Sequence, residues 1–444
     1  MKIVYIVKTK LHYYPPCISQ IRMIKKLGGD IEVIYGTCDE KTRQLLEKEN
    51  INCIKVGNLK DENPKIIEKG LSWLNYRNSL LKKMKQYEKE NTVFWFGTAE
   101  SLMPMKGLLH KYNYNATILE LLDDDDLKRK LLKKMLKNAK VVCCCEETRA
   151  WLMKYWYELK ELPFVFPNKP FDQLTKKRCN PTIDETKKII NDIKNSNILL
   201  SQGVLQTPEE LIEFAKALNK TKNKYKFVLM GIDKYNCVEK LKEYYNDIYY
   251  IPYIPSPFHL EITSYARIGI NFYRPNCLNK AFCAPNKIYE FSGFGIPIIG
   301  NDIPGLKNTI GLNNAGKCID LTEENIIKAI NEIDEKYEYY SKNAYNFFSK
   351  TNNLNTMKKL LLIIFLFAAN SGLAALLSLD IHTPDRPKSM QFAKVYFLPD
   401  WKDKGMAFDS DGDCSAYPLS YCKGYKVADP ASYCPGNSIF FSRC

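Results

Sequence analysis

Short apolar runs alternate with amphipathic, helix-length stretches along most of the chain. In the first half, for example, a β-rich run at 2–7 is followed by an amphipathic stretch at 18–27, which ends at two glycines. Alternation of this kind is typical of βαβ units, in which a parallel sheet carries helices on both faces. We therefore predict a doubly wound α/β domain over residues 1–168, with strands at 2–7, 31–35, 93–96, 116–122, 141–145 and 163–166.

A break in this pattern separates the first round of alternation from a second. The run Pro-Asn-Lys-Pro at 167–170 interrupts it, and we predict that the polar stretch 169–181 is a linker. A second Rossmann-like domain is expected over residues 182–352, with a long helix at 323–348 and strands at 198–200, 227–230, 248–253, 268–272, 296–299 and 317–320. Two such domains in succession predict a cleft between them, because ligands of these sheets bind beyond the carboxyl ends of the strands.

The stretch 284–300, which reads APNKIYEFSGFGIPIIG, predicts a short helix followed by an apolar strand. Pro285 and Asn286 suit the start of the helix. A helix N-terminus can receive a phosphate, because it presents unpaired N–H groups and a partial positive charge. Lys287 adds a full charge there, and Glu290 lies one turn further on, where its carboxylate can accept hydrogen bonds from sugar hydroxyls. These features fit a nucleotide-diphosphate ligand; the alternative is an ordinary helix start with a solvated lysine and glutamate.

Three further residues of the second domain directly follow predicted strands. Gly203, Gly231 and Arg274 all come at the carboxyl end of a strand, close to the predicted cleft. Glycine lets the backbone approach a phosphate closely, and arginine can pair with one. We therefore predict that all three contribute to the same binding site as the helix at 285–293.

Composition narrows the kind of partner. A chain of 444 residues is longer than a single domain with one hydrophobic core usually is. Its 65 Lys plus Arg and 50 Asp plus Glu give a net charge of +15. This charge favours anionic partners such as nucleotides, lipid head groups or nucleic acid. The sequence contains no recognised nucleic-acid-binding module, so we expect no nucleic-acid partner. It also lacks GxGxxG after the first strand, which excludes a dehydrogenase of the Rossmann type.

The fifteen cysteines show two different patterns along the chain. Eleven lie before residue 320, scattered or bunched in apolar runs, which is typical of buried thiols in the cytoplasm. None of these eleven has the spacing of a metal ligand set, so we expect no metal and no cofactor. The last four, in the final 31 residues, lie in a Gly-, Pro-, Ser- and Tyr-rich setting that is typical of disulfides.

A hydrophobic segment at 357–375 lies between these two parts. Met357, Lys358 and Lys359 precede an apolar run at 360–369, which is followed by small residues. This order is typical of a secretory signal peptide, here inside the chain; the alternative is a membrane-spanning helix at 360–379. Either interpretation predicts that residues after 357 are exported or membrane-spanning, and that 376–444 form a Cys-containing, irregular tail. A fusion of two reading frames would explain why the composition of the sequence changes at residue 357.

Residues 1–352 resemble glycosyltransferases of family 4 and related enzymes with the GT-B fold. The resemblance is carried by PNKIYEFSGFGIPIIGNDIPGL, which is similar to the donor-site segment of that family, and by 198–203 and 227–231, which look like its first two donor-domain strands. It implies two Rossmann-like domains facing a cleft, with a nucleotide sugar on the second and a saccharide or lipid-linked acceptor on the first. It further implies transfer with retention of configuration and without a metal, in bacterial surface polysaccharide or glycolipid synthesis.

The resemblance also implies roles for individual residues. Glu290 would hold the ribose hydroxyls, Asn286 and Lys287 would lie beside the diphosphate or the sugar, and Gly203 would admit the phosphates. The chain departs from the family at Phe282, where a second glutamate is usual, and after Gly203, where arginine and lysine are usual. Lys287 and Arg274 are the nearest basic substitutes. These departures leave open an alternative function, a catalytically degenerate GT-B protein that binds a nucleotide sugar or a protein partner.

On the acceptor side, His12 and Asp123 are the candidate catalytic residues. His12 follows the first strand and could act as a general base near neutral pH, although a loop histidine is often a bystander. Asp123 follows the run 118–122 and begins a series of four acids, which could also be a solvated helix start. The basic amphipathic stretch 127–140 predicts a helix that lies on an anionic membrane surface at the inner membrane face, or one with a packed and a solvated side.

Overall fold

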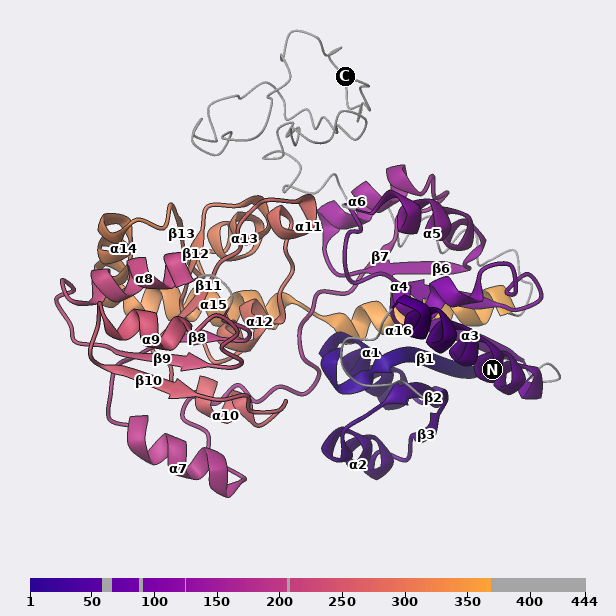
Figure 1. The fold of residues 1–444 in the computed structure, drawn as a ribbon, viewed down its shortest axis with the longest axis horizontal. Helices are drawn as coiled ribbons and strands as arrows, with labels where there is room; N and C mark the ends of the chain where they lie inside the picture. Colours follow the sequence, from indigo (N-terminus) through magenta and orange to yellow (C-terminus); the bar gives the residue numbers. More distant parts are fainter. Residues whose placement is uncertain (58–65, 88–90, 124, 206–207, 369–444) are drawn as a thin grey trace, which may run out of the picture.

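The computed structural model describes residues 1–57, 66–87, 91–123, 125–205 and 208–368, which form two α/β domains side by side (Figure 1). Within this part of the chain, the N-terminal domain contains a seven-stranded sheet in the order β3-β2-β1-β4-β5-β6-β7. All of its strand pairs are parallel. The strands are β1 (Lys2–Lys10), β2 (Asp30–Thr37), β3 (Asn52–Lys55), β4 (Thr92–Phe96), β5 (Tyr114–Thr117), β6 (Val141–Cys144) and β7 (Phe164–Val165).

The C-terminal domain repeats this architecture with a parallel sheet in the order β10-β9-β8-β11-β12-β13. Its first strand, β8, lies in the middle of the sheet, so the strand order reverses between β8 and β11. Ligands of doubly wound sheets bind at such a reversal. The strands described are β8 (Ile198–Gln202), β9 (Lys226–Met230), β10 (Ile248–Ile251), β11 (Ile268–Asn271), β12 (Ile298–Asn301) and β13 (Gly316–Ile319).

Helices cover both faces of each sheet (Figure 1). The N-terminal domain contains α1 (Pro15–Lys26), α2 (Glu40–Lys48), α3 (Ile66–Met84), α4 (Ala99–Leu102), α5 (Asp126–Asn138) and α6 (Glu147–Trp156), with short 3-10 turns at Leu11–Tyr13, Lys85–Tyr87 and Met103–Met105. The C-terminal domain contains α7 (Asp184–Ile193), α8 (Pro208–Leu218), α9 (Cys237–Lys242), α10 (His259–Thr263), α11 (Leu278–Ala281), α12 (Asn286–Gly293), α13 (Pro304–Leu306), a π-helical turn at Lys307–Gly311, α14 (Glu323–Glu335) and α15 (Tyr337–Lys350).

The predicted α/β fold with two Rossmann-like sheets is confirmed, and three elements differ from the prediction. β5 ends at Thr117 instead of residue 122, because the backbone at Leu121 hydrogen-bonds to the other domain and not to a strand. The helix expected at 323–348 is two helices, α14 and α15, which meet at Lys336. β3 was not predicted, because this four-residue edge strand has no apolar run.

The structure describes only the first part of the segment expected to be a signal peptide or a membrane-spanning helix. Residues 353–368 form a helix, α16 (Asn353–Ala368), which runs back across the N-terminal domain (Figure 1). Met357, Leu360, Ile363 and Ile364 are at most 3% exposed and belong to the core on the α1 side of the N-terminal sheet. None of the helices in the described ranges is long and apolar enough to cross a membrane. The rest of the segment, 369–375, and the tail 376–444 with its four cysteines lie outside the described residues.

The eleven cysteines before residue 320 are free thiols, and most of them are buried. The basic helix α5 packs its apolar face into the N-terminal domain, because Leu132, Met135 and Leu136 are all buried there. Lys133 and Lys137 both pair with Glu158. The helix therefore has one packed and one solvated side, as the second interpretation predicts. A contact with a membrane would have to come from its exposed lysines and from Leu127, which is 81% exposed.

The chain crosses between the domains twice, after β7 and between α15 and α16, and the two crossings are joined to each other. Asn353 donates a hydrogen bond of 2.7 Å to the Pro167 carbonyl. The Lys169 ammonium donates to the carbonyls of Phe348 and Thr351 at 2.6 and 2.8 Å, so it caps the end of α15. α16 therefore belongs to the two-domain unit.

Substitutions in α16 test this packing. We expect Leu360→Ala to lower the free energy of unfolding by about 2–5 kcal/mol, because it removes a fully buried side chain. Leu362, two positions away, is 49% exposed, and Leu362→Ala should change stability by no more than about 0.5 kcal/mol. Urea unfolding of the full chain measures both values. Equal effects of the two substitutions would contradict the packing of α16 described here.

Candidate functional site

The start of α12 faces the junction of the two domains. Pro285 precedes the helix in an extended conformation, and the carbonyl of Ala284 accepts a 2.7 Å hydrogen bond from the Asn168 side chain of the other domain. Asn286 is the first helical residue, and its side chain lines a cavity. The predicted helix start is thus present, and residues of both domains surround it.

Glu290 lies on α12 with only 7% of its surface exposed. One carboxylate oxygen accepts a 2.6 Å hydrogen bond from the Gln202 amide, and the other lies 3.5 Å from Nε2 of His259. Gln202 is held in turn by the Thr263 hydroxyl, which donates to its amide oxygen at 2.8 Å. Burial raises the pKa of Glu290, but His259, Lys287 and Gln202 outweigh it, so the net pKa lies below the ordinary value. Glu290 is therefore a carboxylate at neutral pH.

Gly203, Gly231 and Lys287 form one close-packed group. Gly203 has φ +102°, and a Cβ there would lie 2.8 Å from Cε and 2.9 Å from Nζ of Lys287. Gly231 has φ +136°, and its Cβ would lie 1.9 Å from the Gly203 carbonyl oxygen. Burial lowers the pKa of Lys287, while Glu290 partly opposes this effect. The structure thus brings four of the predicted donor-site residues together at the ends of β8 and β9 and the start of α12.

A cavity of about 560 Å³ lies between the domains, next to the start of α12. Its wall combines hydroxyl, amide and charged groups from both domains, which is a lining suited to a sugar with several hydroxyls. The N-terminal domain contributes Tyr13, Tyr14, Thr98, Glu100, Glu120, Lys128, Arg149 and Asn168, and the C-terminal domain Tyr273, Asn279, Lys280, Cys283 and Asn286.

His12 lines a second interdomain cavity of about 310 Å³, whose wall also includes Tyr253, His259 and Glu290. Its Nδ1 accepts a 3.1 Å hydrogen bond from the backbone N–H of Asp39. Burial lowers the pKa of His12, with Asp39 opposing this effect. The ring is therefore neutral at neutral pH. Because Nδ1 is the acceptor, the proton resides on Nε2, which can donate a hydrogen bond to a ligand but cannot accept a proton.

Two predicted residues lie apart from this group. Arg274 is about half exposed and pairs with Glu209 and Glu210, at 2.8 and 2.5 Å, at the start of α8. Asp123 is 1% exposed, and its carboxylate accepts a hydrogen bond from the backbone N–H of Asn279 in the other domain. Neither residue lines the two interdomain cavities. Their predicted roles in donor and acceptor binding remain predictions.

Sequence reasoning missed Gln202, His259 and Arg149. Gln202 is the last residue of β8, so its position at the carboxyl end of a strand was an available signal. His259 begins a five-residue helix, α10, and nothing in the local sequence relates it to Glu290. Arg149 belongs to no motif that predicts a role at the site, whereas the structure shows it buried and hydrogen-bonded to the other domain.

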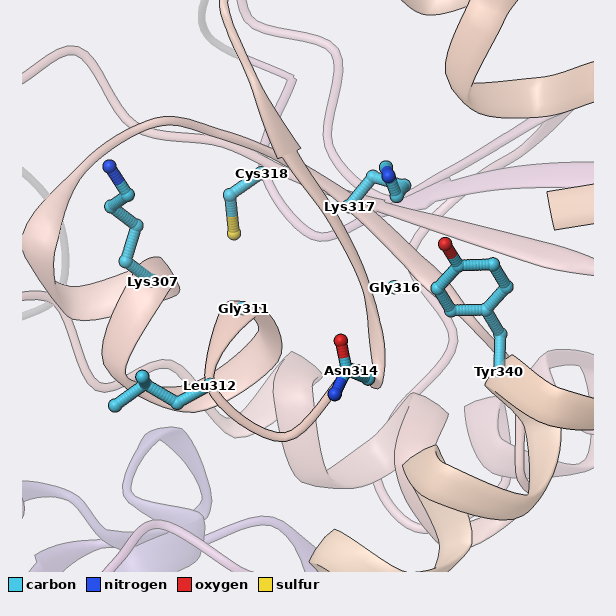
Figure 2. A pocket seen from close by; sticks show the side chains of 8 residues that line it. All are labelled: Lys307, Gly311, Leu312, Asn314, Gly316, Lys317, Cys318 and Tyr340. Atoms are coloured by element: carbon cyan, nitrogen blue, oxygen red, sulfur yellow. The ribbon is translucent and has the colours of Figure 1, made fainter. Parts of the chain in front are cut away.

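A third cavity, of about 290 Å³, lies at the edge strand β13, and Figure 2 shows its lining. It contains Lys307, Lys317, Cys318 and Tyr340 but none of the predicted site residues. Both lysines have carboxylate partners at 2.8 Å, Asp302 and Glu332 respectively. The geometry therefore favours the interdomain cavities as the functional site.

The glycine pair can be tested by its effect on stability. Gly231→Ala should destabilise the protein by at least about 2 kcal/mol, because the new Cβ would overlap the Gly203 carbonyl at a positive φ. The matched control is Gly70→Ala in α3, where a Cβ would meet nothing within 4 Å; it should stabilise the helix by about 0.5–1 kcal/mol. Thermal unfolding measures the stability of both variants. A Gly231→Ala protein as stable as the wild type would contradict the close approach of Gly231 to the Gly203 carbonyl.

Solved glycosyltransferases share this architecture at low sequence identity. A glycosyltransferase from Rickettsia africae aligns with a TM-score of 0.57 and 16% identity, over 84% of this chain and 100% of its own. HepE from Anabaena, solved with UDP and glucose, aligns with a TM-score of 0.59 and 12% identity, over 82% and 99%. The lipopolysaccharide outer core galactosyltransferase WaaB gives 0.53 and 12%, over 82% and 99%.

No protein-family model matches the sequence, and no curated protein does so either. The structural similarity concerns nearly the full length of these enzymes and the part of this chain that forms the two domains. The chain therefore has the GT-B fold, with two Rossmann-like domains facing a cleft.

Proposed function

We propose that the protein transfers a sugar from a nucleotide-diphosphate sugar, linked to UDP or GDP, to a saccharide or lipid-linked acceptor. The observation that carries this proposal is the grouping of charged side chains on α12: Lys287 lies against Gly203 at the end of β8, and Glu290 is bound by Gln202. Asn286, at the start of the same helix, lines the larger interdomain cavity, and Glu290 lines the smaller one. A buried carboxylate suits ribose hydroxyls, and a partly buried ammonium beside a helix N-terminus suits a diphosphate. The structure of HepE, which has a similar fold and was solved with UDP-glucose, supports the donor class.

In the proposed reaction, the acceptor oxygen forms a bond to the anomeric carbon while the bond from that carbon to the diphosphate breaks. Lys287 and the N–H groups of α12 stabilise the charge that develops on the departing diphosphate, so we propose that no metal is required. The acceptor proton passes to an oxygen of that diphosphate, on the same face, which retains the anomeric configuration. His12 then serves as a hydrogen-bond donor from Nε2, in keeping with its contact to Asp39.

The wider setting that we propose is bacterial surface polysaccharide or glycolipid synthesis in the cytoplasm, at the inner face of the membrane. WaaB, with a similar fold, acts on the lipopolysaccharide outer core. The free thiols of the described residues fit a reducing compartment. Sedimentation with vesicles of anionic and neutral lipids tests the membrane contact, which we expect to come from the exposed lysines of α5 and from Leu127.

A second candidate function is a degenerate GT-B protein that binds a nucleotide sugar or a protein partner without transfer. Two observations favour it: Phe282 replaces the second glutamate of the family pattern, and Arg274 is engaged by Glu209 and Glu210. Binding of a nucleotide sugar without hydrolysis or transfer would support this candidate against the first.

Nucleotide release from a panel of UDP- and GDP-sugars, with and without EDTA, tests the proposed function. We expect nucleotide release from at least one donor, and we expect EDTA to leave it unchanged. The rate of release should fall about tenfold or more in Lys287→Ala and in Glu290→Gln, because each substitution removes a charged hydrogen-bonding group. A contact of that kind contributes about 1.5–3 kcal/mol, which corresponds to such factors. Lys307→Ala, in the third cavity, is the control and should retain full activity. Unchanged turnover in Lys287→Ala would contradict its assigned role.

The lowered pKa of Lys287 predicts a pH dependence. The charged ammonium is the form that binds phosphate, so nucleotide affinity should be complete below the pKa of Lys287 and decline as the pH rises through it, at a lower pH than for an ordinary lysine. Lys287→Arg retains its charge at every pH of the measurement and should remove this decline. Calorimetric titration with UDP or GDP between neutral and alkaline pH measures it. The same decline in Lys287→Arg would assign the effect to another group.

A further inference from the structure

A segment of the C-terminal domain is built into the core of the N-terminal domain. α11 and the loop after it, residues 277–284, follow β11 in the chain and lead directly into α12. Leu278 and Phe282 are 6% and 1% exposed, and both belong to the hydrophobic cluster of the N-terminal domain. In Figure 1, α11 lies beside α6 at the junction of the domains. Residues 277–284 of the C-terminal domain are therefore packed against the hydrophobic core of the N-terminal domain.

Arg149 of α6 binds the backbone of this segment. Its Nε donates to the Phe282 carbonyl at 2.6 Å, and Nη2 donates to the Asn279 carbonyl at 2.7 Å. Nη1 donates to the carbonyl of Leu119, in its own domain, at 2.7 Å. Arg149 is 5% exposed, so these charge-assisted bonds lie in a region from which water is largely excluded. The planar guanidinium thus fixes two backbone carbonyls of the C-terminal domain relative to one backbone carbonyl of the N-terminal domain.

Asn279 is held by the N-terminal domain at three of its polar groups, one of which is the carbonyl that Arg149 binds. Its N–H donates to the Asp123 carboxylate at 3.1 Å, and its side-chain oxygen accepts from the N–H of Leu121 at 2.9 Å. Two residues before α12, the Ala284 carbonyl accepts from Asn168. The N-terminal domain therefore contacts this segment as far as Ala284, which directly precedes Pro285, the N-cap residue of α12.

We propose that Arg149 is a positioning residue for the donor site, which holds residues 279–284 and thereby places the start of α12, with Asp123 in a supporting role. The assignment of this helix start to the donor rests on the function proposed above, but the positioning itself does not. Arg149 lines the larger interdomain cavity, but its Nε, Nη1 and Nη2 each donate to a protein carbonyl, so we assign it a role that acts through the position of α12. The acceptor domain accordingly builds part of the donor site.

Arg149→Met tests this proposal in the full chain, with Arg149→Lys as the conservative variant. Hydrogen exchange of the ligand-free protein should become faster at 277–290 in Arg149→Met and stay unchanged in the central strands of both sheets. The affinity for UDP or GDP should fall by about tenfold or more, because two charge-assisted contacts are lost. Once donor is saturating, kcat should change far less than the donor KM, and Arg149→Lys should recover part of the affinity.

Arg267→Met is the matched control, because Arg267 is another partly buried arginine, paired with Asp334 at 2.7 Å on the donor domain away from residues 277–290. It should leave nucleotide affinity and exchange at 277–290 unchanged. Unaltered exchange at 277–290 in a folded Arg149→Met protein would overturn the proposal, as would equally faster exchange throughout both domains. Failure of the wild-type protein to bind any nucleotide, with exchange at 277–290 still responding to Arg149→Met, would overturn the proposed function alone.

Discussion

The burial of Phe282 and Leu278 in the core of the opposite domain is the constraint on which the cleft depends. Two Rossmann-like sheets joined by a single linker could adopt many relative orientations. Here an apolar anchor, the Arg149 guanidinium and the return of α16 to the N-terminal domain restrict them to one. Because the anchor is only a few residues from α12, the orientation of the domains and the position of the helix start are set by the same contacts.

The buried carboxylate of Glu290 is stable because polar groups of the protein surround it. A buried carboxylate is costly without hydrogen bonds, and Glu290 receives them from Gln202 while His259 lies close by. Lys287 lies against Gly203, where no side chain could fit. These contacts lie within the protein, so the protein itself orients the groups proposed to meet a diphosphate and a ribose, which is how a preorganised site gains its electrostatic effect.

The parallel sheets and most of the proposed donor site could be predicted from the sequence, because both depend on local patterns. Apolar runs separated by amphipathic stretches indicate βαβ units, and a glycine after a strand indicates close backbone approach. Gln202 and His259 could not be found this way, since a single polar residue carries no period and its partner is distant in the chain. The packing of Leu360 against the N-terminal domain could not be predicted for a related reason. An apolar helix can have the same composition in a membrane, in a signal peptide and in a protein core, and only tertiary contacts distinguish these cases.

The residue type at position 282 affects both the packing of the two domains and the polar groups that are present near α12. A glutamate at this position, surrounded by the apolar cluster of the N-terminal domain, would bury a charge where the structure provides carbon atoms, at a cost of several kcal/mol or a raised pKa. A side chain at 282 therefore cannot both anchor the domains and present a carboxylate to a sugar. The chain has the anchor, so polar contacts to the proposed sugar would have to come from residues that line the interdomain cavity, such as Asn279, Lys280 and Asn286.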